Sequence, residues 1–287
     1  MVALPSLKSK IFDYYTLTKP GIAFVVLFST LTGYWISSPI AWNAKLFHTL
    51  FGTALVSFAA GMLNMVLEID SDALMVRTRL RPLPDKRISP AVAFILGVFS
   101  GSIGIVHLCA SVNLMAGFFA SLSLVLYLVF YTPLKKISSI CIGVGAISGA
   151  LPPLIGNAAA LGKIDAAGWI LFVILFLWQF PHLLALFWMY QEDYERAQLK
   201  MVPFLDGEKG SARWAWMGTL LLVASSALPI LFGISGWVYG VGAIAANIAL
   251  LFFAWTFYKT VSKKSAKQLF LTTIFYIPFL FGLLLLS

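Results

Sequence analysis

Long apolar runs dominate this sequence of 287 residues. Runs of about 20 residues, enough to cross a hydrocarbon core of roughly 30 Å, recur from Gly21 almost to the C-terminus. Only 11% of the residues are charged, whereas a soluble domain usually carries about 25%. Such a chain cannot form a water-soluble globule, so we expect an integral membrane protein.

The apolar runs and their breakers predict nine membrane spans. The segments are apolar all round and lack the alternating polarity of β-barrel strands, so helices are the spanning structure that remains. The first run has no small-residue cleavage site, and we interpret it as a retained helix. We expect residues 1–287 to form one polytopic all-α domain with spans near 20–39, 46–68, 90–109, 113–132, 138–159, 167–189, 214–233, 237–258 and 268–286.

Positive charge is distributed unevenly between the two ends of these spans. All but two of the 20 Lys and Arg residues precede the first span or lie in the second, fourth, sixth and eighth connections; the exceptions are Lys45 and Lys163. The positive-inside rule therefore predicts a cytoplasmic N-terminus. The net charge of +9 is an orientation signal, and no basic soluble module that could bind nucleic acid is present. The lack of an Arg- and Ser-rich presequence favours a bacterial inner membrane.

A first acidic cluster follows the second span, in the stretch NMVLEIDSDALMVRTRLRP. Asn64, Glu68 and Asp72 recur every four residues and should share one face of a helix at its cytoplasmic end, with Asp70 off that stripe. Oxygen ligands of this kind suit Mg²⁺, which usually takes one or two carboxylates together with substrate phosphates. We expect a Mg²⁺ site here, with Asn64, Glu68, Asp70 and Asp72 as candidate ligands; the alternative is a solvated helix end.

A second acidic cluster follows the sixth span, and basic residues lie between the two clusters. Asp193 is a candidate for a second metal site facing the first. Lys135, Arg77 and Lys200 are candidates for gripping substrate phosphate oxygens, although a lysine at a helix end also anchors the helix at lipid headgroups. His182, inside the span, is either a packing residue or a heme-binding or acid/base group.

These motifs resemble the UbiA superfamily of intramembrane prenyltransferases, and within it the protoheme IX farnesyltransferases, or heme O synthases. The resemblance rests on N-x3-E-x-D-x-D and M-x-R-T-x-x-R-P-L at 64–83, Y-T-P-L-K at 131–135, G-A-I-S-G-A-L-P-P-L-I-G at 145–156, and W-Q-F-P-H with E-D-Y-x-x-A at 178–197. Two positions depart from the pattern: Glu68 stands where the family usually has Asp, and Ala197 stands where the wider superfamily often has Asp.

The resemblance implies an activity and a set of roles. Farnesyl diphosphate and protoheme IX would be the substrates and heme O the product, with a heme A synthase or terminal oxidase downstream. Asn64, Glu68 and Asp72 would hold Mg²⁺ on the diphosphate, with help from Asp193. The residues that would contact the diphosphate are Arg77, Tyr131, Lys135 and Lys200.

Two other readings of the sequence remain open. A UbiA-type enzyme that prenylates an aromatic quinone precursor or a chlorophyllide would share the metal site. A membrane transporter would also carry charged residues within its spans. Transporters usually show matching interruptions in two halves, whereas the charge here gathers at one face.

Overall fold

The structure is a computed structural model that describes residues 7–38, 43–201 and 209–286. Within these residues, nine helical segments are long and apolar enough to cross a membrane, which confirms the predicted all-α membrane bundle. The segments are Pro20–Ser37, Ala44–Leu67, Pro90–Ser111, Leu114–Leu134, Cys141–Leu161, Ala166–Met189, Gly210–Leu231, Trp237–Thr260 and Lys263–Leu286. The largest difference from the predicted boundaries is five residues, at the start of the last span.

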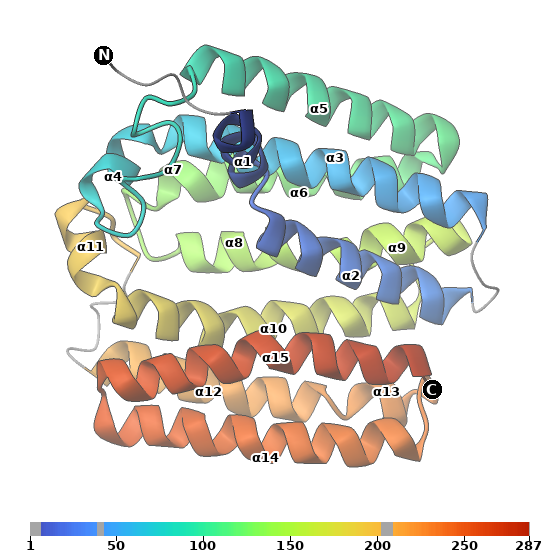
Figure 1. The fold of residues 1–287 in the computed structure, drawn as a ribbon. Coiled ribbons are helices and arrows are strands. Elements are labelled where there is room, and N and C mark those ends of the chain that lie inside the picture. The colour runs from blue at the N-terminus through green and yellow to red at the C-terminus, as the bar shows by residue number, and fades with distance from the viewer. Residues whose placement is uncertain (1–6, 39–42, 202–208, 287) are drawn as a thin grey trace.

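Several spans are broken into shorter helices, and short helices also lie outside the spans (Figure 1). Pro152 begins a new helix within the fifth span, and a π-helical turn interrupts the fourth. In chain order the helices are α1 (Leu7–Leu17), α2 (Pro20–Ser37), α3 (Ala44–Leu67), α4 (Ile69–Leu74), α5 (Pro90–Ser111), α6 (Leu114–Val125), η1 (Leu126–Tyr131), α7 (Thr132–Leu134), α8 (Cys141–Ala150), α9 (Pro152–Leu161), α10 (Ala166–Met189), α11 (Gln191–Arg196), α12 (Gly210–Ser225), α13 (Leu228–Leu231), α14 (Trp237–Thr260) and α15 (Lys263–Leu286).

Local sequence signals set where many of the spans begin. We call the end of the bundle that carries α4, α7 and α11 the cap end; it lies at the left of Figure 1. At the opposite end, the side chains of Asn43, Asn113 and Asp165 each accept a hydrogen bond from a backbone N–H of the first turn of α3, α6 and α10. At the cap end, Pro20 and Pro90 occupy the first helical positions of α2 and α5.

Glycines let α2 and α9 approach closely, side by side in Figure 1. A Cβ added at Gly156 would lie 1.9 Å from the carbonyl oxygen of Thr30, and one added at Gly33 would lie 2.1 Å from that of Pro153. In lipid there is little hydrophobic drive for helices to associate, and small residues allow the close van der Waals packing that holds them together instead. This crossing holds the first span against the fifth.

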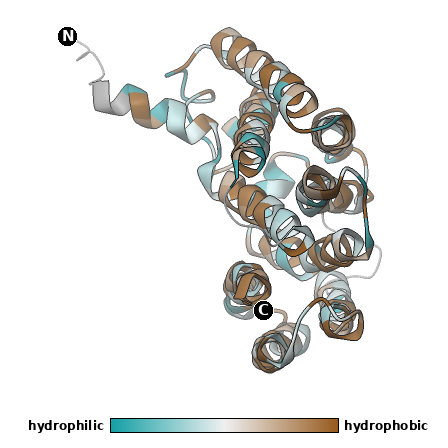
Figure 2. Ribbon diagram, turned by 90° about the vertical axis from the view of Figure 1, so that its right-hand side faces the viewer, coloured by the Kyte–Doolittle hydropathy of each residue, from teal (hydrophilic) through white to brown (hydrophobic). Residues whose placement is uncertain are grey.

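The last three spans form a layer of their own beside the other six. In Figures 1 and 2, α12, α14 and α15 group together, and α15 packs against both α10 and α2. Through α15 this layer supplies one wall of an internal cavity, whose remaining walls come from α2, α3, α6 with η1, α8 with α9, and α10.

Candidate active site

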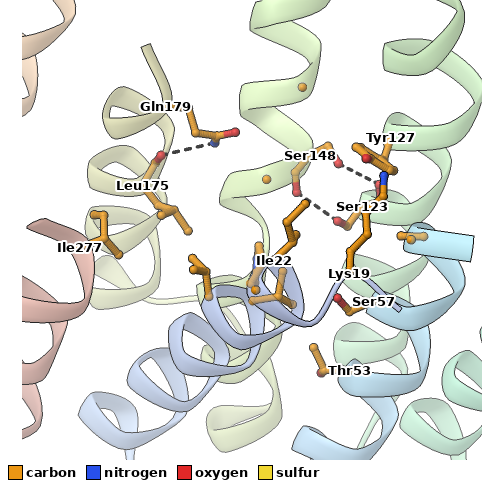
Figure 3. A pocket seen from close by; sticks show the side chains of 18 of the residues that line it. Lys19, Ile22, Thr53, Ser57, Ser123, Tyr127, Ser148, Leu175, Gln179 and Ile277 are labelled. Atoms are coloured by element: carbon orange, nitrogen blue, oxygen red, sulfur yellow. Dashed lines mark hydrogen bonds between the residues drawn. The ribbon is translucent and has the colours of Figure 1, made fainter. Parts of the chain in front are cut away.

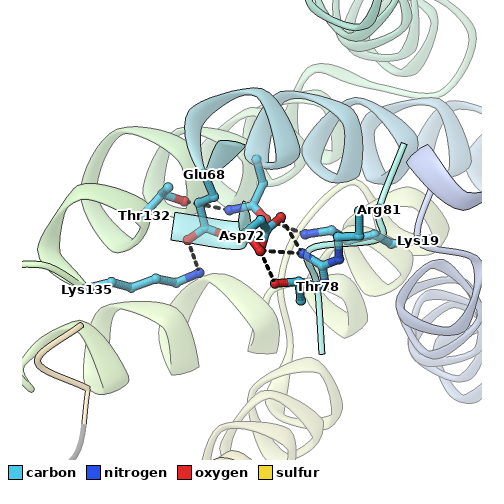
Figure 4. A network of polar contacts seen from close by, with 8 residues as sticks. Lys19, Glu68, Asp72, Thr78, Arg81, Thr132 and Lys135 are labelled. Atoms are coloured by element: carbon cyan, nitrogen blue, oxygen red, sulfur yellow. Dashed lines mark hydrogen bonds and ion pairs between the residues drawn. The ribbon is translucent and has the colours of Figure 1, made fainter. Parts of the chain in front are cut away.

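The predicted acidic stripe forms at the cap end (Figure 4). Helix α3 ends at Leu67 and α4 begins at Ile69, yet the hydrogen bonding keeps its period across the junction. The N–H of Glu68 donates to the carbonyl oxygen of Asn64 at 3.0 Å, and the N–H of Asp72 donates to that of Glu68 at 2.7 Å. Asn64 and Asp72 are each 1% exposed. The three side chains therefore share one buried face despite the break.

Each carboxylate of the stripe is paired with a basic side chain. Lys135 Nζ lies 2.7 Å from Glu68 Oε1. Arg81 Nη1 lies 2.9 Å and 2.7 Å from the two carboxylate oxygens of Asp72. Uncompensated buried charges are costly, and these contacts give each buried acid a basic partner.

Lys19 completes the cluster from the other side. It lies at the turn between α1 and α2 in the left-handed backbone conformation, with φ 50° and ψ 61°. Its Nζ donates to Asn64 Oδ1, and Asn64 Nδ2 donates to Thr132 Oγ1 at 3.1 Å. Three cations, Lys19, Arg81 and Lys135, thus surround two carboxylates, which makes the cluster suited to receive an anion.

Burial and neighbouring charge shift the pKa values in this cluster. Burial lowers the pKa of Lys19 from 10.5 to about 7, and the charges of Arg81 and Lys135 act in the same direction. For Glu68, burial opposes ionisation, but the ammonium groups of Lys135 and Lys19 outweigh it, so its pKa is lowered. For Lys135, burial opposes protonation, but Glu68 outweighs it and the pKa is raised. The Glu68–Lys135 pair is therefore ionic, while Lys19 titrates near neutrality.

The π-helical segment η1 turns the end of the fourth span into the site. Thr132 Oγ1 donates to the carbonyl oxygen of Tyr127 at 2.8 Å, which leaves it to accept from Asn64. Lys135 Nζ lies 4.3 Å from the centre of the Tyr131 ring, which packs on Gly145, where a Cβ would come within 2.7 Å of the ring. Single π turns inside helices often occur at functional sites.

A cavity of about 520 Å³ opens beneath the cluster. Figure 3 shows Lys19 and Tyr127 at one side of it, with Ile22, Leu175 and Ile277 among its apolar walls. Lys19 belongs to both the charged cluster and the cavity, so a ligand with an ionic head and an apolar tail can occupy the two at once. Pockets of 300–1,000 Å³ are typical for small molecules and cofactors.

Four other predicted site residues lie outside this buried cluster. Asp70 is exposed on α4. Lys200 is also exposed, and its backbone N–H donates a hydrogen bond to the carbonyl oxygen of Lys135. Arg77 is exposed and lies 4.9 Å from the centre of the Tyr190 ring. The Asp193 carboxylate accepts hydrogen bonds from the backbone N–H groups of Val76 and Arg77 at 3.0 and 3.1 Å. Asp193 therefore ties α11 to the loop that follows α4.

His182 lies in the cavity wall in a fixed orientation. Its ring stacks between those of Trp178 and Phe270, with centroid distances of 4.5 and 4.7 Å. Its Nδ1 lies 2.9 Å from Thr273 Oγ1, whose own hydrogen is donated to the carbonyl oxygen of Phe270 at 2.6 Å. Thr273 must then accept from Nδ1–H, so the neutral ring carries its lone pair on Nε2.

The donor set of the stripe fits Mg²⁺ bound together with a phosphate. Across the described ranges of the chain, no three His, Cys, Asp or Glu side chains gather into a metal-binding group. Two carboxylates and the Asn64 amide oxygen are nevertheless the oxygen ligands that this ion uses when substrate phosphates complete its shell.

The sequence reasoning missed Lys19 and Arg81 as members of the cluster. Lys19 directly precedes Pro20, so its position just before the first span could be predicted from the sequence. Its approach to Asn64 could not, because it depends on how α1 turns into α2. Arg81 stands nine residues after Asp72 in the R-T-x-x-R-P motif, and only the fold of the loop returns it to that acid.

The fold and the charged site at the mouth of an apolar cavity are those of an intramembrane prenyltransferase. Residues 26–280 match the UbiA prenyltransferase family, and the chain belongs to that family. It is 38% identical to a protoheme IX farnesyltransferase of Solibacter usitatus, covering 96% of this chain and 98% of the relative. It is 40% identical to a protoheme IX farnesyltransferase of Salinibacter ruber, covering 96% and 99%.

Solved structures agree on the fold. One described as a digeranylgeranylglyceryl phosphate synthase in membranes superposes with a TM-score of 0.80 at 19% identity, covering 96% of this chain and 98% of that one. A UbiA homolog from Archaeoglobus fulgidus bound to GPP and Mg²⁺ gives a TM-score of 0.66 at 14% identity, covering 95% and 99%.

Proposed function

We propose that this protein transfers a farnesyl group from farnesyl diphosphate to a vinyl group of protoheme IX, with addition of water, to give heme O. One observation carries the proposal: three cations and two carboxylates share a buried cluster that opens, through Lys19, into an apolar cavity. That arrangement suits an isoprenoid diphosphate. The heme acceptor is supported by relatives that carry the name protoheme IX farnesyltransferase over nearly their full length.

Asn64, Glu68 and Asp72 would hold Mg²⁺ on the diphosphate. The bound ion would neutralise charge that develops on the leaving group. In the structure, Arg81 forms an ion pair with Asp72 and Lys135 forms one with Glu68. With Asp72 and Glu68 serving as ligands to the ion, Arg81 and Lys135 would be free to donate hydrogen bonds to the phosphate oxygens.

The transfer itself needs little more than positioning and charge. The C–O bond breaks with its electrons leaving on the diphosphate, which Lys19, Arg81 and Lys135 stabilise. Apolar walls such as Ile22 and Ile277 keep water from the allylic cation. Arg77 and Lys200, both exposed, would guide the diphosphate as it enters.

The acceptor would lie against α10 and α15. The vinyl π electrons form the new C–C bond, water then adds to the resulting carbocation, and one proton is lost. His182 lines the cavity, and with Nδ1 held by Thr273 its Nε2 carries the lone pair that would bind the protoheme iron. The product would pass to a heme A synthase or a terminal oxidase.

The distribution of positive charge supports a cytoplasmic cap end. All but two Lys and Arg residues lie at that end or in the connections that join spans there. We therefore propose one polytopic domain in a bacterial inner membrane, with its active-site face in the cytoplasm.

The decisive test is an acceptor assay with the purified protein. Incubation with protoheme, farnesyl diphosphate and Mg²⁺ should yield hydroxyethylfarnesyl heme by mass spectrometry. Asn64→Ala and Asp72→Ala should abolish the product, whereas Asp70→Ala, at an exposed neighbour, should not. Prenylation of 4-hydroxybenzoate without any heme product would overturn the acceptor and keep the metal site.

A further inference from the structure

Helix α1 runs across the direction of the membrane spans. Figure 1 shows it end-on while the spans lie in the page, and Figure 2 shows it in the page, projecting from the bundle, while the spans are end-on. Two perpendicular views thus agree that α1 lies parallel to the membrane plane.

The side of α1 turned away from the bundle is apolar and aromatic. Ile11, Phe12 and Tyr15 are 61%, 65% and 56% exposed, whereas Asp13 and Leu17 are buried. At 3.6 residues per turn, the three exposed side chains cover roughly 100° of the helix surface, opposite the buried pair. An arc of that width is enough for an amphipathic helix to rest on an apolar phase.

The negatively charged side chain of α1 lies on its buried side and not on this exposed side. Asp13 is the one acid in the sequence of α1, and its two carboxylate oxygens share the N–H of Arg87 Nε at 3.1 Å each. Lys10 is exposed. The free surface of α1 therefore combines aromatic and aliphatic groups with positive charge, which is the composition of helices that lie at a bilayer surface.

The apolar side of α1 adjoins the lipid-facing surface of the first span. Only two residues separate α1 from α2, on which Phe24, which does not line the cavity, is 60% exposed. Because the protein is a membrane protein whose outer surface meets lipid, the same lipid phase reaches the base of α1.

We propose that α1 is seated in the headgroup layer of the leaflet at the cap end, with Ile11, Phe12 and Tyr15 in lipid, and that this seat positions Lys19. Aromatic side chains favour this interfacial depth. Leu17 is fully buried, and its carbonyl oxygen lies so close to Gly61 that a Cβ there would come within 2.8 Å. The chain between this anchor and Lys19 is one residue long, so the tilt of α1 sets where the Lys19 ammonium lies.

Spin-label accessibility tests whether α1 lies in the headgroup layer, and the test does not require activity. A label at Tyr15→Cys, in a Cys109→Ser, Cys141→Ser background reconstituted in liposomes, should collide with oxygen more than with a water-soluble nickel reagent. Phe99→Cys, on the exposed side of α5 within a span, and Asp85→Cys, on an exposed loop, set the lipid and water limits. A Tyr15 label that matches the Asp85 label overturns the proposal.

A kinetic arm tests the coupling to Lys19 and depends on the proposed activity. Phe12→Glu should raise KM for farnesyl diphosphate three- to tenfold with kcat nearly retained, and Phe12→Leu should restore the wild-type value. An unchanged KM in a Phe12→Glu protein whose Tyr15 label has left the lipid would refute the coupling. The accessibility result is independent of the acceptor, so it stands even if protoheme proves to be the wrong substrate.

Discussion

Lys19 is the group in the site whose charge should change near neutral pH. Burial lowers its pKa to about 7, with Arg81 and Lys135 adding to the effect and Glu68 and Asp72 opposing it. Below pH 7 the ammonium form predominates and can hold a diphosphate oxygen, and above pH 7 the side chain becomes neutral. We therefore predict that capture of farnesyl diphosphate weakens as pH rises through 7, and that Lys19→Arg abolishes this weakening because arginine stays charged.

The size of the effect follows from the titration. At pH 8 about one Lys19 side chain in ten would still be charged. Each further pH unit would lower kcat/KM about tenfold, or about 1.4 kcal/mol. The parameter to measure is kcat/KM, since its pH dependence reports groups of the free enzyme.

The lowered pKa of Lys19 also affects the stability of the fold. Between pH 7 and 10.5 the folded protein binds fewer protons than the unfolded chain, so the contribution of Lys19 to stability increases with pH across that window.

Initial rates of product formation from pH 6 to 9, measured by mass spectrometry, would test this reasoning. The substrate has its own ionisations, but they are common to every variant and cancel in the ratio of wild type to Lys19→Arg. Lys10→Arg, at an exposed position, is the matched control and should keep the wild-type profile. An alkaline decline in Lys19→Arg as steep as that of the wild type would refute the role of Lys19.

Three further predictions concern the ion pair, the helix crossing and the metal. Lys135→Ala should lower kcat/KM by about 10²- to 10³-fold, whereas Lys136→Ala, exposed beside it, should change it little; equal losses in steady-state rates would contradict the site. Gly156→Ala should destabilise the α2–α9 crossing by about 1–3 kcal/mol or more and lower the thermal unfolding midpoint, while Gly143→Ala, with open space around it, should not. Chelation of divalent metal should abolish turnover and added Mg²⁺ should restore it; activity that survives chelation would exclude the metal.

The spans were predictable because length and apolarity decide them almost alone. A run such as that of α10 has no alternative to a helix in lipid, where every backbone polar group must be paired within the segment. The breaks inside spans were less accessible. Pro152 signals one, but the π turn before Tyr131 has no strong sequence mark, and α1 is too short and mixed in composition for a hydropathy reading to identify it.

The acidic stripe was predictable from its four-residue period, whereas the partners of its acids were not. Asn64, Glu68 and Asp72 lie on one stretch of chain, so helix geometry brings them together. Lys135 reaches Glu68 across 67 positions of sequence. That contact depends on helix packing and on the π turn, which no local pattern records.

The pairing of acids with cations explains how a charged site can exist beneath a membrane surface before any substrate arrives. Glu68 and Lys135 are about 12% and 9% exposed, and neither could remain ionised there alone. A metal ion would offer the acids a positive partner, and a diphosphate would offer the cations a negative one. If both bound together, each protein ion pair could be replaced by two new pairs and no charge would be left unpaired. A glutamate has one methylene more than an aspartate, and this added reach brings the Glu68 carboxylate to 2.7 Å from Lys135 Nζ. That ion pair neutralises the Glu68 carboxylate within the buried cluster.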